Sequence, residues 1–223
     1  MKNLKKSIRI CWVLMVVLCL FTGCKKDETN YMEGTDEALA KNVKTELVEF
    51  QDDKYAVFVE NKNNVAVDYL FEFELYDESG KKLNTAGGGG YTVGANKKIV
   101  FDVDLTRETY DSYKKVVYAA KYEDDEYKKY YFDGISITIA KEGEDFMATF
   151  KNNNNENIGT IDATIVYYKD KKVVAVDTIF VDDINANESK KEEIYEPLDE
   201  NYNYISYDSY EVTLLDAFTN FDF

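Results

Sequence analysis

Hydrophobic and polar residues alternate with a period of two along much of the chain, which is typical of β-strands with one buried face. The clearest stretch is Phe71-Glu72-Phe73-Glu74-Leu75-Tyr76-Asp77, in which apolar and acidic side chains take turns. A polar turn follows, and Gly80 within it suits a positive φ. Helical periodicity is nearly absent, because only 36–43 has the pattern for a turn or two of helix.

Short extended runs separated by polar turns predict two groups of strands. The first group lies near 44–50, 55–61, 68–77, 81–86, 91–93, 98–104 and 113–122. The second lies near 135–140, 145–152, 159–169, 172–181, 190–195 and 210–218. Six or seven short strands in each group, with turns between them, are typical of all-β sandwiches.

The two groups of strands are divergent copies of one module. Asn61-Lys62-Asn63-Asn64 corresponds to Asn152-Asn153-Asn154-Asn155, and Val93-Gly94-Ala95-Asn96 corresponds to Ile184-Asn185-Ala186-Asn187, each about ninety residues on. The letters YDSY occur at 110–113 and again at 207–210, which is 97 residues apart. The larger spacing predicts an insertion in the second copy, near 201–204.

One alignment of the copies keeps the apolar faces in step. It matches the apolar positions of 71–75 with those of 163–167, whereas a shift by one residue would match them with Asp162 and its alternate neighbours. Tyr113 and Tyr210 then each precede the last strong strand of a copy. Immunoglobulin-like folds often place a tyrosine at that corner with its hydroxyl bonded to nearby backbone, so we expect a structural role for both.

The N-terminal residues have a different pattern. Four basic residues within 1–9 precede an apolar run at 10–21, which is short for a membrane-spanning helix and right for a signal peptide. Phe21-Thr22-Gly23-Cys24 follows and resembles the lipobox of bacterial lipoproteins, with Phe21 in place of the usual Leu. A plain membrane anchor or an ordinary secretory signal is the alternative.

The lipobox resemblance implies lipid attachment at Cys24 and an anchor on the extracytoplasmic face of the cell membrane. The chain would be cut before Cys24, whose thiol would carry diacylglycerol, and two acyl chains such as palmitate suffice for stable anchoring. Cys11 and Cys19 would leave with the signal peptide. No thiol would then remain for a disulfide or a soft-metal site.

The net charge limits the classes of partner. The chain carries a formal charge of −16, and removal of residues 1–23 takes away four basic residues and no acidic ones, leaving −20. Binding to nucleic acid needs Lys and Arg for the phosphates. A surface this acidic therefore argues strongly against nucleic-acid binding. It also argues against lying flat on anionic lipid, and solubility is its simplest role.

The motif Phe73-x-Leu75-Tyr76-Asp77 resembles the signature of the FxLYD domain family, and the following turn with Gly80 fits as well. The resemblance covers about 43–125. It extends more weakly over about 134–223, where the motif has become Ile165-x-Tyr167-Tyr168-Lys169. It implies small immunoglobulin-like β-sandwiches, which are common in bacterial lipoproteins and carry no established catalytic activity.

We therefore predict an all-β protein with two immunoglobulin-like β-sandwich domains in tandem after a lipoprotein signal peptide. The expected parts are the signal peptide at 1–23, a lipidated cysteine and linker at 24–42, the first sandwich at 43–125, a second linker at 126–133 and a divergent second sandwich at 134–223. A flexible first linker would span about 25 Å on average.

The sequence offers little catalytic chemistry. It has no His and neither a G-x-S-x-G motif nor a phosphate-binding glycine motif, so we expect no catalytic residues, no cofactor and no enzyme. Zinc is disfavoured without His or thiolate. The acidic clusters at 52–53, 123–126 and 182–183 lack EF-hand spacing, and we interpret them as solvated surfaces rather than calcium sites.

The candidate binding surface is Gly87, Gly88, Gly89 and Gly90 together with Tyr91. The run corresponds to 178–181 of the second copy, which has good strand residues. It is either a loop or bulge at a sheet edge, or bare backbone that a partner strand or glycan can approach.

Three tyrosines between the copies, Tyr127, Tyr130 and Tyr131, are expected to cement the two sandwiches together. The alternative is an exposed aromatic patch for glycan or protein.

The leading hypothesis is a non-enzymatic, membrane-anchored extracytoplasmic lipoprotein that binds or positions a protein or a cell-wall or other envelope polymer, and does not bind nucleic acid. One alternative is a solute or small-ligand receptor associated with a transporter, which would require a deep apolar pocket between the domains. An envelope hydrolase, a further alternative, would require two carboxylates about 5–10 Å apart in a groove.

Overall fold

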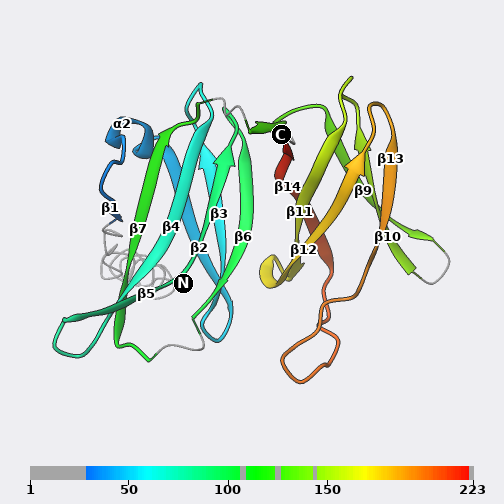
Figure 1. Cartoon of the computed structure of the whole chain (residues 1–223). Coiled ribbons are helices and arrows are strands. Elements are labelled where there is room, and N and C mark those ends of the chain that lie inside the picture. The colour runs from blue at the N-terminus through cyan, green and yellow to red at the C-terminus, as the bar shows by residue number, and fades with distance from the viewer. Residues whose placement is uncertain (1–28, 106–108, 124–126, 143–144, 221–223) are drawn as a thin grey trace, which may run out of the picture.

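The computed structural model describes residues 29–105, 109–123, 127–142 and 145–220, which form two β-sandwiches (Figure 1). The first contains β1 (Thr29–Tyr31), α2 (Glu37–Ala40), β2 (Val43–Gln51), β3 (Lys54–Asn61), β4 (Val67–Tyr76), β5 (Lys82–Val93), β6 (Lys98–Asp104) and β7 (Ser112–Lys121). The second contains β8 (Lys128–Tyr130), β9 (Ile135–Glu142), β10 (Asp145–Asn152), β11 (Ile158–Lys169), β12 (Lys172–Ile184), β13 (Ser189–Ile194) and β14 (Ser209–Asn220). The predicted all-β, immunoglobulin-like fold class is confirmed.

The two sandwiches have the same strand order, although β1 runs parallel to β7 and β8 runs antiparallel to β14. In the first, the sheet β1-β7-β4-β5 faces the sheet β2-β3-β6, and in the second, β12-β11-β14-β8 faces β13-β10-β9. In each module the short fourth strand, β1 or β8, adds to the edge next to the last long strand. The repeat seen in the sequence is therefore a repeat of the fold.

The period-two pattern of β4 places its apolar side chains in the first core. Phe71 and Phe73 are fully buried and Leu75 is 1% exposed, and their rings and methyl groups pack against β3 and β6. The equivalent strand β11 buries its own alternate residues in a separate second core. Leu75 pairs with Tyr113, and Tyr167 pairs with Tyr210, so the alignment chosen from the sequence is confirmed.

The two repeated tyrosines have different surroundings. The ring of Tyr113 packs edge-on against those of Tyr55 and Phe73, with centroids 5.9 and 4.9 Å away. The hydroxyl of Tyr210 lies 3.5 Å from the carbonyl oxygen of Ile139, on a strand of the opposite sheet. For Tyr210 the expected bond to nearby backbone is thus replaced by a long contact to a distant strand.

The described part of the expected first linker is folded onto the first sandwich. β1 pairs in parallel with β7, and the amide of Asp36 donates to the carbonyl of Ala119 at 2.8 Å. The Asp36 side chain caps α2, which ends at the buried Ala40. Residues 29–42 are therefore part of this module rather than a flexible tether, because they add a strand to its sheet.

The predicted signal peptide at 1–23 and the lipid-attachment residue Cys24 lie outside the described residues. Within the described residues, no helix has the length and apolar character needed to cross a membrane.

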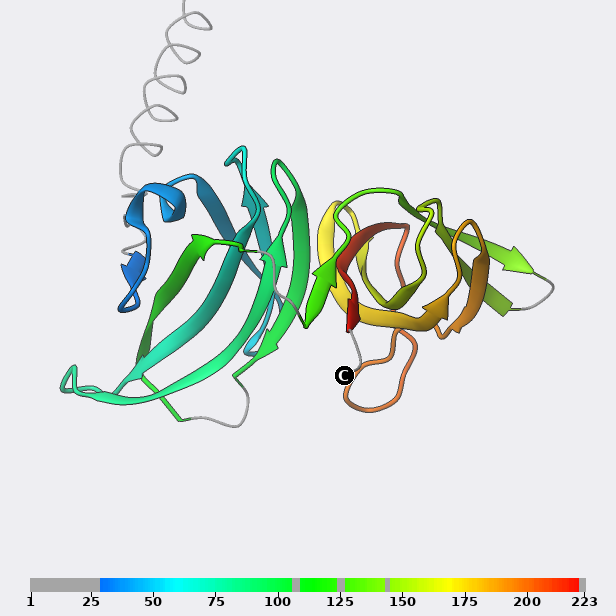
Figure 2. The same cartoon turned by 45° about the horizontal axis from the view of Figure 1, so that its top comes forward.

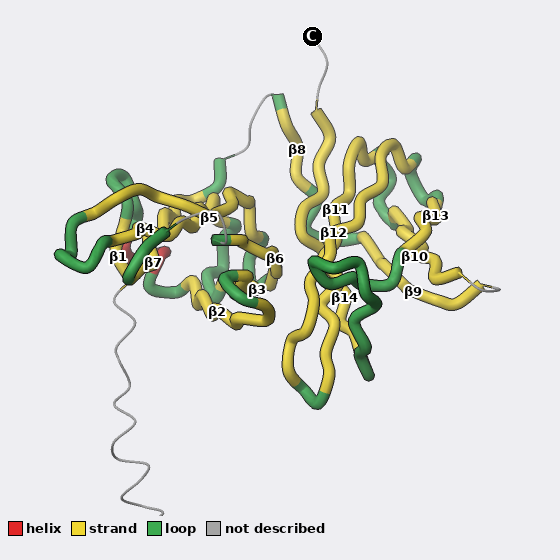
Figure 3. Tube along the Cα trace, turned by 90° about the horizontal axis from the view of Figure 1, so that it is seen from below, coloured by secondary structure: helices red, strands yellow, loops and turns green. Residues whose placement is uncertain are grey.

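The two sandwiches pack face to face, with the β2-β3-β6 sheet of the first against the β12-β11-β14 sheet of the second (Figure 3). Ala56 and Val100 meet Val166 and Val173, and all four are buried. Thr164, itself fully buried, donates from Oγ1 to the carbonyl of Val100 at 2.5 Å. β11 is consequently covered on both faces, which explains the loss of alternation in its second half, at 163–168.

The segment between the modules joins them through aromatic side chains. β8 lies beside β14 at the junction (Figure 2), and Tyr130 contacts both Tyr122 of the first module and Phe218 of the second, with ring centroids 5.4 and 6.0 Å away. Tyr131 is buried in the second core, whereas Tyr127 is 50% exposed. The predicted cementing role is thus confirmed for Tyr130.

Candidate functional site

The glycine run lies in β5, at the edge of its sheet. The sequence predicted two strands here, and the structure has one continuous strand with a bulge opposite Phe71–Phe73. Gly87 and Gly88 have φ of 60° and 131°, and a Cβ on Gly88 would lie 2.4 Å from the carbonyl oxygen of Phe71. Only glycine fits this bulge, so the run has a structural reason that is independent of any partner.

Tyr91 points toward the first core. Its ring lies 4.7 Å from that of Phe101, and a Cβ on Gly89 would come within 2.6 Å of it. Gly90 and Tyr91 also line a hollow of about 350 Å³ together with Leu70, Tyr118 and Tyr130, among others. The candidate surface therefore combines an exposed glycine backbone with a half-buried tyrosine.

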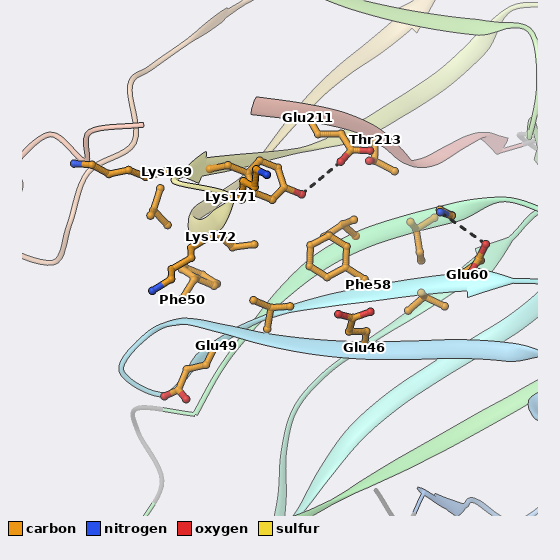
Figure 4. A pocket seen from close by; sticks show the side chains of 18 of the residues that line it. Glu46, Glu49, Phe50, Phe58, Glu60, Lys169, Lys171, Lys172, Glu211 and Thr213 are labelled. Atoms are coloured by element: carbon orange, nitrogen blue, oxygen red, sulfur yellow. Dashed lines mark hydrogen bonds and ion pairs between the residues drawn. The ribbon is translucent and has the colours of Figure 1, made fainter. Parts of the chain in front are cut away.

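A larger groove of about 880 Å³ lies between the two sandwiches (Figure 4). Its first wall is the outer face of β2, β3 and β6, and its second wall is the β11–β12 hairpin with the start of β14. The lining from Lys44 to Phe50 runs along β2, which corresponds to about 20 Å of extended chain. The predicted glycine run does not line this groove.

Apolar side chains form the floor of the groove. Val48, Phe50 and Phe58 come from the first sandwich, and Tyr168 and Val173 from the second. All five belong to the cluster that joins the modules. The groove is thus a continuation of the module interface to the surface.

Charged side chains of both signs line each rim, with Lys44 and Lys98 on the first wall and Asp170 and Glu211 on the second. Glu46 and Glu49 lie on the β2 wall, and Lys171 and Lys172 lie on the opposite hairpin. Glu46 pairs with Lys44 at 3.2 Å. The hairpin turns through Asp170 and Lys171 with φ of 50° and 65°, which holds the two lysines at a tight tip.

The sequence did not predict the groove. Phe50 and Phe58 lie on strands whose opposite face packs into the first core, and pairing of β2 with β3 puts both side chains in the cluster on the outer face. The one available signal was the loss of alternation at 163–168, which indicates a strand covered on both faces.

A second polar feature is a set of half-buried carboxylates on the sheet that faces the first sandwich. Burial raises the pKa of Asp216 to about 6, with Lys128 opposing the shift and Asp162 adding to it. Burial is also the main cause of the raised pKa of Asp162 and of Asp177, and Asp102 of the first module adds to the latter. These carboxylates meet at the junction of the modules.

Asp162 and Asp216 are direct cross-strand partners on β11 and β14. Such partners have Cβ atoms about 5 Å apart. Neither residue lines the 880 Å³ groove. This pair therefore does not supply the two carboxylates in a groove that the hydrolase alternative would require.

The acidic clusters have ordinary partners where they are described. Asp53 accepts a hydrogen bond of 2.6 Å from the hydroxyl of Tyr110, and Asp182 accepts one of 3.0 Å from Thr160. Within the described part of the chain, no group of three or more Asp, Glu, His or Cys side chains is arranged to hold a metal ion.

No protein-family model matches the chain, and no curated protein matches it. Among solved structures, it is similar to red sea bream transglutaminase with a TM-score of 0.22 and 11% identity, over 83% of this chain and 34% of that one. The chain thus spans about a third of the length of that protein. A likeness of this size does not inform its function.

Proposed function

We propose that this protein is a non-enzymatic, lipid-anchored binding protein of the cell envelope that holds an extended segment of a partner protein or envelope polymer in the groove between its sandwiches. The observation that carries the proposal is the groove of about 880 Å³, with its apolar floor and with charged side chains of both signs on its rims. The aromatic and aliphatic floor supplies affinity, and the charged rims give direction and register.

The length of the groove favours an extended segment over a compact solute. About 20 Å along β2 accommodates some six residues of extended chain or a few sugar units. A segment whose apolar side chains meet Phe50 and Phe58 would place its charged groups between Glu49 and Lys172.

A transporter-associated solute receptor is the second candidate, and the volume of the groove favours it. Small-molecule sites are typically about 300–1,000 Å³, which includes the observed value. Charged residues make up half of the lining, ten of twenty residues, so such a solute would be zwitterionic rather than apolar.

The lipobox resemblance at Cys24 supports the anchored location. β1 begins at Thr29, five residues beyond Cys24, and that distance is at most about 17 Å of chain. The first sandwich would then stand directly above the membrane, and anchoring would raise the effective concentration of the groove for partners at that surface.

In-cell cross-linking tests the proposal. The lipidated protein carries a photo-reactive phenylalanine analogue at Phe50 in the groove, or at Phe180, which is 61% exposed and does not line the groove. We expect adducts from position 50 that are absent from position 180 and that disappear in the Cys24→Ala variant. Equal adducts from both positions, or none while the protein is at the membrane, would contradict the proposal.

A further inference from the structure

The connection between β13 and β14, residues 195–208, is longer than its counterpart in the first sandwich. The first module joins β6 to β7 with residues 105–111, half that number. The insertion predicted near 201–204 lies within the longer loop, which extends from the second sandwich in Figure 1. Because the first module closes the same connection without it, the fold does not require the extra segment. We call residues 195–208 the tyrosine loop.

The tyrosine loop concentrates exposed aromatic surface. Tyr202 is 84% exposed, Tyr204 74% and Tyr195 72%, and Leu198 beside them is 45% exposed. Large apolar side chains gathered at one exposed place are typical of interaction sites rather than of monomer surfaces. Tyrosine in particular offers contact area with few rotatable bonds.

Hydrogen bonds within the loop hold this surface in one shape. The carboxylate of Asp199 accepts from the amides of Asn201 and Asn203 at 2.8 Å, and the amide of Ile205 donates to the carbonyl of Pro197 at 2.8 Å. Tyr202 has a φ of 62°, an unusual conformation for an aromatic residue. The loop is therefore ordered before any partner binds, which lowers the entropic cost of binding.

The base of the loop is fixed to the second sandwich. The ring of Tyr207 packs against that of Tyr167 with centroids 4.8 Å apart, and Asp208 accepts from the amide of Asp170 at 2.8 Å. These contacts fix the position of the exposed tip relative to the second sandwich.

The charge of the loop indicates the chemistry of its partner. Residues 195–208 contain four tyrosines, four acidic residues and no Lys or Arg. Asp199 and Asp208 are used in bonds within the protein, which leaves Glu196 and Glu200 beside the exposed rings. Aromatic faces and carboxylates both attract cations, whereas an anionic polymer would be repelled.

We propose that the tyrosine loop is a second binding surface, separate from the groove, for a partner protein that presents Lys or Arg among apolar side chains. The rings of Tyr202 and Tyr204 would cover the cationic and apolar groups, and Glu196 and Glu200 would neutralise their charge. Neutral glycan, the other occupant for exposed tyrosines, is an outcome of the test.

The test uses the full chain in neutral detergent and fluorescein-labelled peptides of alternating Arg and Leu, with Glu-Leu and Ser-Leu peptides and a chito-oligosaccharide as comparisons. Fluorescence anisotropy measures binding. We expect binding of the Arg peptide alone, and about tenfold weaker binding by the Tyr202→Ser, Tyr204→Ser double variant. The Glu196→Gln, Glu200→Gln variant is expected to bind more weakly and with less dependence on salt.

The matched control is the double variant Tyr31→Ser, Tyr127→Ser, whose side chains are 38% and 50% exposed elsewhere on the chain. It should bind as the wild type does, and the melting temperatures of the two loop variants should stay within a degree or so because their altered side chains are exposed. Equal loss in both double variants, no loss in either, or preferred binding of the oligosaccharide would overturn the proposal.

Discussion

Asn152 repeats, 91 residues later, the buried environment of Asn61. Both side chains are fully buried. The Nδ2 of Asn61 donates to the carbonyls of Val65, Val93 and Gly94 at 2.9, 2.9 and 3.0 Å. Val65 lies in the connection between β3 and β4, and Val93 and Gly94 lie where β5 ends and the next turn begins, so one amide ties these two segments together.

The corresponding bonds in the second sandwich have the same spacing along the chain. The Nδ2 of Asn152 donates to the carbonyls of Glu156, Ile184 and Asn185, which lie 4, 32 and 33 residues after it. The three acceptors of Asn61 lie at the same distances along the chain from Asn61. In each module the side-chain oxygen also accepts from the amide two residues later at 2.9 Å. The Asn-rich matches in the sequence therefore mark one structural device used twice.

Replacing either buried asparagine should destabilise its sandwich. Asn61→Ala or Asn152→Ala leaves buried carbonyls without donors, so the free energy of unfolding should fall by about 3 kcal/mol. Urea titration followed by circular dichroism measures this. The exposed neighbours give matched controls, because Asn64→Ala and Asn155→Ala remove none of the buried bonds, and Asn155 loses only an exposed 3.4 Å contact from Asn187. Equal losses for buried and exposed positions would contradict the assignment.

A charge at the centre of the module interface should separate the sandwiches. Val166 is fully buried there, and Val166→Asp would bury an unpaired carboxylate. We expect two calorimetric transitions in place of one and a larger radius of gyration by small-angle X-ray scattering.

Glu74 is the control for that substitution, because it occupies the position of Val166 in the first module and faces outward beside Lys82. Glu74→Asp should leave the single transition intact. A single transition in Val166→Asp would show that the modules do not depend on this contact.

The stability of the junction should depend on Asp216 at neutral pH. Burial raises the pKa of this carboxyl group to about 6, so the folded state binds its proton more tightly than the unfolded chain does. Its contribution to stability is therefore fully present below about pH 4 and is lost as the pH rises through about 6. Asp216→Asn should raise the free energy of unfolding by about 1–2 kcal/mol at pH 7.5 and change it little at pH 4.

Thermal unfolding of the wild type and Asp216→Asn across this range provides the measurement. Asp183→Asn, at an exposed position on β12, is the control for the loss of one negative charge. An equal gain at both pH values for Asp216→Asn would contradict a titrating role.

The bulge in β5 should tolerate no side chain at Gly88. The Cβ of Gly88→Ala would lie 2.4 Å from the carbonyl oxygen of Phe71, so β4 and β5 would have to part. We expect a loss of about 2–4 kcal/mol in unfolding experiments. Gly80→Ala separates the two causes, because Gly80 has a φ of 77° with open space around it and should cost only about 1 kcal/mol. Similar losses at both sites would show that φ alone matters.

The sequence by itself determined the class of fold, the duplication and the faces of the core strands. These features depend on local patterns, since alternation at 71–77 selects one buried face and the Asn-rich matches repeat at a fixed spacing. It also located the insertion at 201–204, because two copies of one fold reveal any extra residues in either. The sequence did not show which of those residues would be exposed.

Only the tertiary structure decided how the two modules meet and what lies between them. The groove depends on Phe50, Phe58 and Tyr168, which are brought together from three strands and two sandwiches. The loss of alternation at 163–168 indicates only that this strand is covered on both faces, and no local pattern shows which residues of the other sandwich it meets. The same holds for Asp216, whose pKa is raised by burial within the fold and not by its neighbours in the sequence.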